Sequence, residues 1–136
     1  DVGNADPQAL SVATAAALAS ERLGMPEARI PLAQAAIYVA CAPKSNSACV
    51  AIDEAMNWVA GHKTEAIPPY LQDAHYQGAK KLGHGLDYKY AHDYKNHYVK
   101  QQYLPDGVEG QHFYHPGELG HEYEMDRYLK KIKEES

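Results

Sequence analysis

The sequence predicts a mainly α-helical protein, and three observations lead to this class. Residues 1–66 hold 18 alanines and only one of the 11 tyrosines, Tyr38. Helix start and stop signals bracket three segments in this alanine-rich half. Near the C-terminus, acidic residues precede lysines 130, 131 and 133, an order that matches a helix dipole. The remaining ten tyrosines and seven of the eight histidines lie in residues 70–136.

Length and composition restrict the class of protein. The chain has 136 residues and 15.0 kDa, the size of one domain, with the hydrophobic and charged content of an ordinary globular protein. No run approaches about 18 apolar residues, so we expect no transmembrane helix. A net charge of -5 argues against a domain-wide grip on nucleic acid, although a local basic patch stays possible.

Two further features bear on the origin of the chain. Cys41 and Cys49 are too few for a zinc quartet and do not indicate a disulfide scaffold, so we expect them in a reducing, cytoplasmic compartment. The chain starts at Asp1 without a methionine or a signal-peptide pattern. We therefore expect a piece excised from a longer protein.

The first helix is expected to run to about Leu23. Asp6 is a good N-cap, and Pro7 suits the first helical position, where its missing N–H costs nothing. Gly24 and Pro26 supply the stop signal.

Two more helices follow in the alanine-rich half. The second is expected over 31–42, between Pro31 and Pro43, and with Gln34 as its only strongly polar side chain it should be buried nearly all round. The third is expected over 46–60, after a Ser45 cap and before Gly61.

Two apolar residues fall on otherwise polar helix faces. Leu18 lies within the polar stripe of the first helix, and Val50 lies on the face of the third helix that should meet water. A monomer gains nothing from an apolar side chain there, so we interpret both as candidate subunit-interface residues.

The second half of the chain is less regular. A short helix is expected over 68–73, no period is sustained over 74–117, and 98–104 is either a short strand or a helical turn. A closing helix is expected over 118–134. We therefore divide one domain, 1–136, into a helical core (1–66), an irregular segment (67–117) and a C-terminal part (118–136).

The sequence offers little support for catalysis or metal binding. A histidine-rich group invites a metal hypothesis, but His121 and Glu122 lack the second histidine of a zincin motif. Gly61-His62-Lys63-Thr64 only superficially resembles a phosphate-binding loop, because the first glycine is missing and the stretch follows a helix. We expect no catalytic residue and no metal site. The metal-site hypothesis concerns His92, His97, His112, His115, Glu118, His121 and Glu122.

A basic, tyrosine-bearing stretch is a candidate DNA contact. Lysines and histidines interleave there with tyrosines, a combination that tracks phosphates and stacks on bases of single strands. The alternative is that the tyrosines pin the long loop to the helices while the lysines only face solvent. The candidate contacts are Lys80, Lys81, His84, Lys89, Tyr90 and Lys95.

Seven short segments, in order along nearly the whole chain, carry a family resemblance. They are DVGNADP (1–7), RLGMPE (22–27), IPLAQA (30–35), APKSN (42–46), YQGAKKLGHG (76–85), YKYAHD (88–93) and QQYLPD (101–106), with Gly110, Phe113 and Tyr114 beyond. Together they resemble the C-terminal portion of the RarA/MgsA family of AAA-type ATPases, which includes the Werner helicase-interacting protein.

The resemblance implies a helical bundle similar to the clamp-loader collar, which assembles the protein into a homotetramer. It also implies a replication-associated recombination protein that acts at stalled forks, associates with single-stranded DNA-binding protein and works at the nucleoid. ATP and Mg would bind an upstream AAA module with DNA-dependent ATPase activity. No nucleotide-binding motif of the family occurs in these residues, so we expect no cofactor in this chain and no membrane partner.

Overall fold

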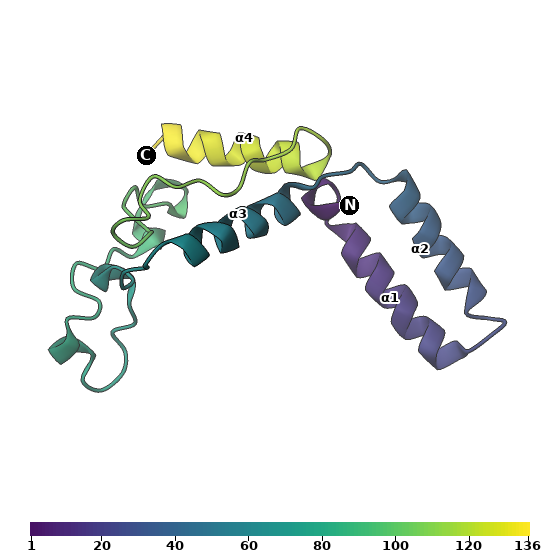
Figure 1. Ribbon diagram of the computed structural model, residues 1–136, viewed down its shortest axis with the longest axis horizontal. Helices are drawn as coiled ribbons and strands as arrows, with labels where there is room; N and C mark the ends of the chain where they lie inside the picture. Colours follow the sequence, from purple (N-terminus) through teal and green to yellow (C-terminus); the bar gives the residue numbers. More distant parts are fainter. The chain divides into compact units, whose positions relative to one another are not determined.

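The computed structural model describes all 136 residues, and its regular secondary structure is entirely helical. Four α-helices, α1 (Gln8–Leu23), α2 (Arg29–Cys41), α3 (Ser47–Gly61) and α4 (His121–Glu134), are joined by loops (Figure 1). Five 3-10 turns complete it: η1 (Gly3–Ala5), η2 (Pro69–Leu71), η3 (Ala79–Leu82), η4 (Ala91–Asp93) and η5 (Lys95–His97). The predicted mainly α class is confirmed. None of the helices combines the length and apolar character needed to cross a membrane.

The chain forms two compact units, and each unit joins distant segments. The first contains residues 1–54 and 113–127, and the second contains residues 55–112 and 128–136. Helices α3 and α4 each contribute residues to both units.

In the first unit, α1 and α2 form an antiparallel hairpin (Figure 1). Asp6 Oδ1 accepts the backbone N–H of Gln8 at 3.0 Å, as expected of a residue that starts α1. Its other carboxylate oxygen accepts the hydroxyl of Tyr38 on α2 at 2.7 Å. Gly24, in a conformation with φ of 68°, ends α1. One acidic side chain thus starts one helix and ties it to the next.

The prediction that α2 is buried on nearly all sides is wrong for this chain. No residue of α2 is buried, and Ile30 and Ile37 are each about two-thirds exposed. The physical reason is that α2 packs against α1 alone, so most of its apolar surface has no neighbour. The apolar composition of α2 predicted that its surface is buried, but composition does not identify a surface that would cover it.

The third helix begins close to its predicted position. Ser45 Oγ accepts the backbone N–H of Ser47 at 3.2 Å, in keeping with the predicted role of Ser45 at this helix start. At the other end, the His62 ring stacks on Trp58 with ring centroids 4.1 Å apart. His62 Nδ1 also lies 2.7 Å from the Trp58 carbonyl oxygen. The stretch that superficially resembled a phosphate-binding loop is therefore a helix C-terminus.

Side-chain hydrogen bonds organise the irregular segment of the second unit. The Tyr70 hydroxyl donates to the Gln102 carbonyl at 2.6 Å, and the Tyr103 hydroxyl donates to the Val99 carbonyl at 2.6 Å. The backbone N–H of Gly85 donates to the Pro69 carbonyl at 2.7 Å. Residues 98–104 form neither a strand nor a helix, because their backbone instead receives bonds from tyrosine side chains.

Candidate functional site

The predicted interface residues lie on helices of the first unit. Leu18 is 51% exposed on α1, beside a hollow of about 470 Å³ that Ala15, Ala19, Arg22 and Leu23 also line. Val50 is only half-buried on α3. Both residues therefore keep apolar surface in contact with solvent, but the structure does not bring them together in one patch.

The scarcity of charged residues around Leu18 continues along the whole α1–α2 hairpin. Residues 8–20 and 30–41 contain no Asp, Glu, Lys or Arg, and the hairpin's only charges lie near its tip at Glu21, Arg22, Glu27 and Arg29. Exposed protein surface normally carries charge, and charged residues are depleted at the centre of interfaces. Sequence analysis detected only Leu18 in this patch, because it judged each helix by its own polar stripe.

The predicted DNA-contact residues lie in the second unit and have different surroundings. Lys80 and Lys81 on η3 and Lys89 in the following loop are exposed and form no ion pair. Lys95 lies 3.5 Å from Glu135, so its charge is partly neutralised. The His84 ring contacts the Tyr76 hydroxyl. The three unpaired lysines are the members of the set most available to a phosphate.

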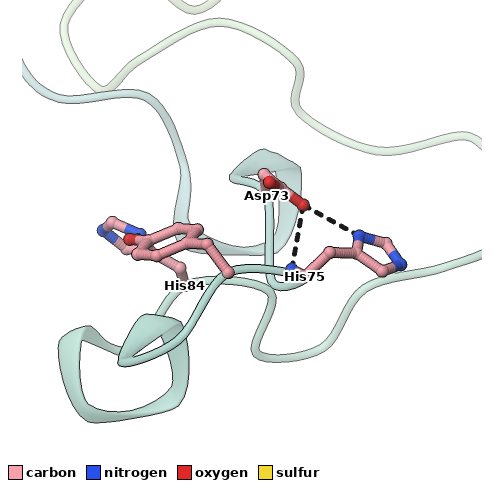
Figure 2. Close-up of polar contacts among 4 residues, drawn as sticks. Asp73, His75 and His84 are labelled. Carbon is pink, nitrogen blue, oxygen red and sulfur yellow. Dashed lines mark hydrogen bonds and ion pairs between the residues drawn. The ribbon is translucent and has the colours of Figure 1, made fainter.

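Figure 2 shows the polar contacts beside this stretch. Asp73 Oδ1 accepts the backbone N–H of His75 at 2.9 Å and lies 2.8 Å from its Nδ1. The hydrogen bond from the His75 backbone is the main reason that the pKa of Asp73 lies below its ordinary value. His75 is fully solvent-facing, with a side chain that is 96% exposed. The pair closes a local turn, and His84 contacts Tyr76 separately.

The tyrosines of the irregular segment fall into two groups. Tyr70 and Tyr103 donate hydrogen bonds to carbonyls within the segment, and Tyr114 donates to Glu122 on α4. Tyr88 and Tyr90 of the basic stretch are more than half exposed. The DNA-contact hypothesis and the loop-pinning alternative both stay predictions.

The histidines considered for a metal site lie apart in separate contacts. The rings of His92 and His97 approach with centroids 4.6 Å apart, whereas His115 lies 3.3 Å from Glu54 and His121 lies 3.6 Å from Glu124. No group of three or more His, Cys, Asp or Glu residues in the structure has an arrangement that could hold a metal ion.

Sequence reasoning missed the most tightly held polar group, Glu122. This residue in the first turn of α4 is 0% exposed. Its carboxylate accepts four hydrogen bonds: from Ser45 Oγ at 2.7 Å, from the Tyr114 hydroxyl at 2.9 Å, from the Gly117 N–H at 2.5 Å and from Ser47 Oγ. Ser45 and Ser47 lie 77 and 75 residues away in sequence, so no local pattern could have revealed the cluster.

The electrostatics of the Glu122 cluster favour a charged carboxylate. Desolvation alone would raise the pKa of Glu122, but the hydrogen bonds outweigh desolvation and the pKa lies below its ordinary value. Desolvation, together with the bond to Glu122, raises the pKa of Tyr114 to about 12. Tyr114 therefore stays protonated and donates. The cluster fixes the start of α4 against the start of α3.

Comparison with known proteins gives a consistent result. A family profile described as "MgsA AAA+ ATPase C terminal" matches residues 1–133. The chain is 50% identical over 132 residues to replication-associated recombination protein A of Bacillus subtilis and 36% identical over 136 residues to that of Escherichia coli K12. It is also 35% identical over 115 residues to the ATPase WRNIP1 of Dictyostelium discoideum.

These alignments cover most of the chain but only part of each relative. They span 97%, 99% and 84% of the chain, but 31%, 30% and 13% of the Bacillus, Escherichia and Dictyostelium proteins. The chain therefore corresponds to less than a third of the length of each of these relatives.

Proposed function

Because this chain belongs to the family of MgsA AAA+ ATPase C-terminal domains, we propose that it is a homotetramerisation module of a replication-associated recombination ATPase. The observation that carries the proposal is the apolar surface that the chain leaves exposed. The buried apolar residues include no leucine, methionine or aromatic residue, whereas Leu10, Ile37 and Met56 are each more than 60% exposed. Such a distribution suits a subunit that buries its larger apolar side chains against other subunits.

Two of the relatives are named replication-associated recombination proteins, and we propose the same role for the parent protein. We propose that the parent acts at stalled forks in the cytoplasm, at the nucleoid, and that it contacts DNA and single-stranded DNA-binding protein. The parent's ATP and Mg site would lie in the AAA module, outside this chain.

Sedimentation equilibrium of the 136-residue chain tests the proposal. We expect a mass near four times 15.0 kDa at micromolar concentrations, and we expect Leu18→Asp together with Val50→Asp to dissociate the tetramer without loss of helix content. Each buried apolar side chain contributes roughly 1.5–3 kcal/mol, counted once per subunit. A wild-type chain that stays at 15 kDa would refute the assembly function.

A second candidate function is a contact with single-stranded DNA through residues 80–95. The observation that favours it is the exposure of three unpaired lysines, Lys80, Lys81 and Lys89, beside Tyr88 and Tyr90. Asp87 and Asp93 lie in the same stretch and reduce its net positive charge. Salt-dependent binding of single-stranded DNA would favour this function over assembly alone.

A further inference from the structure

A groove of about 860 Å³ opens in the second unit beside the basic stretch. Its volume lies in the range of about 300–1,000 Å³ that is usual for small-ligand sites. Leu82 and His84 belong both to this groove and to residues 80–95, the candidate DNA contact, so the two surfaces are continuous. The lining of the groove includes Glu65, Pro68, Tyr70, Gln72, Leu82 and Asp106.

The side chains of this groove offer mainly hydrogen-bond acceptors. The lining contains no Lys or Arg, and Glu65 forms no ion pair. Gln102 Nε2 donates to Asp106 Oδ1 at 3.0 Å, which leaves the other carboxylate oxygen of Asp106 free. The Tyr70 hydroxyl already donates to the Gln102 carbonyl. The groove is therefore acidic and rich in unused acceptors.

One acceptor in the wall of the groove has no partner. Gln72 Oε1 is buried and accepts no hydrogen bond, whereas Gln72 Nε2 donates to the Ile67 carbonyl at 2.6 Å. An unsatisfied buried acceptor costs free energy, and most such atoms in proteins have a partner. Because the Gln72 side chain as a whole is only half-buried, a small rotation of its amide turns Oε1 toward a donor in the groove. The groove therefore favours a ligand that donates hydrogen bonds.

We propose that this groove accepts an unpaired guanine base of a single strand whose phosphates lie along Lys80 and Lys81. The inference rests on the second candidate function, contact with single-stranded DNA, and specifies which base the contact selects. Guanine presents its N1–H and its N2 amino group side by side, and two parallel donors match a carboxylate such as that of Glu65 or Asp106. Thymine presents one N–H between two carbonyl oxygens, which carboxylates repel.

The charges beside the groove separate the phosphates of a strand from its bases. Lys80 and Lys81 are exposed and unpaired on η3, directly before Leu82 in the groove wall. The lysines attract a phosphate, and the carboxylates inside the groove repel it. A strand that lies with its backbone on η3 therefore presents a base, and not a phosphate, to the groove. Proline and leucine side chains in the wall offer apolar contact to the faces of that base.

Fluorescence anisotropy with two labelled oligonucleotides tests this selectivity. One is a dT tract of about 12 nucleotides, and the other carries a single central dG in the same tract. We expect the 136-residue chain to bind the dG strand about tenfold more tightly, as is usual for a bidentate contact to a base. Glu65→Gln with Asp106→Asn should lower this ratio to less than about twofold, because an amide cannot accept both guanine donors.

Asp87→Asn with Glu109→Gln is the matched control. Both carboxylates are exposed in the second unit, and neither lines the groove. The control removes the same charge, so a general gain in affinity from weaker repulsion occurs in both double variants, whereas only the groove variant loses the preference for dG. Lys80→Ala with Lys81→Ala should weaken binding of both strands and keep the ratio.

A photoreactive guanine analogue at the central position tests the groove without any substitution, and we expect its cross-links within residues 65–72 and 102–107. If the chain binds neither strand, the DNA-contact function fails and this inference falls with it. If it binds both strands equally, if the groove variant keeps the preference, or if cross-links occur only elsewhere, DNA contact stands and the groove proposal is wrong. Binding of an arginine-containing peptide that requires Glu65 and Asp106, without any preference for dG, would also overturn it, because a basic peptide would then be the occupant.

Discussion

A single carboxylate, that of Glu122, joins the two chain segments that make up the first unit, residues 1–54 and 113–127. Its carboxylate receives hydrogen bonds from a serine pair before α3, a tyrosine and a backbone N–H before α4. A buried carboxylate with four donors is a stable arrangement, whereas the same donors without the carboxylate are unsatisfied. Glu122 therefore stabilises the fold chiefly by accepting the hydrogen bonds of these four donors.

Replacing this carboxylate with an amide should destabilise the first unit in a pH-dependent way. Glu122→Gln puts an amide donor against four donors, and we expect a loss of about 3 kcal/mol in the free energy of unfolding at pH 7. Because the folded pKa of Glu122 is lowered, its stabilisation is present above the unfolded pKa of about 4.3 and is lost as pH falls through the folded value. The difference between wild type and variant should therefore shrink below about pH 4.

Urea unfolding over a pH series measures this difference. Glu124→Gln is the matched control, because Glu124 lies on the same helix with a side chain that is 76% exposed, and it should change stability by less than about 0.5 kcal/mol. A gap between wild type and Glu122→Gln that persists unchanged to pH 2 would contradict the argument.

At the scale of elements, the ends of the helices could be predicted from local sequence signals, whereas contacts between distant residues could not. The ends of α1, α2 and α3 lie within two residues of their predicted positions, because Asp6, Gly24 and Pro43 act on their immediate neighbours. The last helix begins at His121 rather than residue 118, after Gly120 with φ of 60°. A glycine in that conformation separates residue 118 from the helix.

Burial and loop structure were harder to predict. The apolar composition of α2 correctly predicted a helix but wrongly predicted its burial within one chain. The irregular segment takes its order from bonds such as Tyr70 to Gln102, which join residues 32 apart. Such pairs leave no periodic trace in the sequence.

The exposed lysines of the second unit allow a test of the DNA-contact hypothesis. Replacing Lys80, Lys81 and Lys89 together with alanine should weaken binding of single-stranded DNA by the full-length parent. The slope of log affinity against log salt should fall by up to about one phosphate contact per lysine. The triple variant at Lys63, Lys131 and Lys133, which are also exposed, is the control. An unchanged slope would leave only the loop-pinning role for this segment.

At the scale of the whole molecule, the chain leaves many of its larger apolar side chains exposed, and five of its nine buried apolar residues are alanines. Exposed apolar residues occur along α3 as well, at Ile52, Met56 and Val59. Their spacing of four and three residues places them along one side of that helix. The chain therefore leaves a second apolar stripe exposed.

A chain without a nucleotide-binding motif should not hydrolyse ATP by itself. We expect the purified 136-residue chain to show no DNA-stimulated ATP turnover above a contaminant control, because it contains neither a Gly-Lys-Ser/Thr loop nor an acidic strand end beside one. A phosphate-release assay with and without single-stranded DNA provides the measurement. Turnover that copurifies with the chain through successive columns would contradict this expectation.

The long sequence separation of the Glu122 bonds has a consequence for the order in which the chain folds. The α1–α2 hairpin joins neighbouring segments and can close early, whereas the bonds from Ser45 and Ser47 must close loops of 77 and 75 residues. During synthesis, the hairpin is complete long before residue 122 has been made. Each nascent chain therefore presents its apolar hairpin to its surroundings before the Glu122 bonds can close.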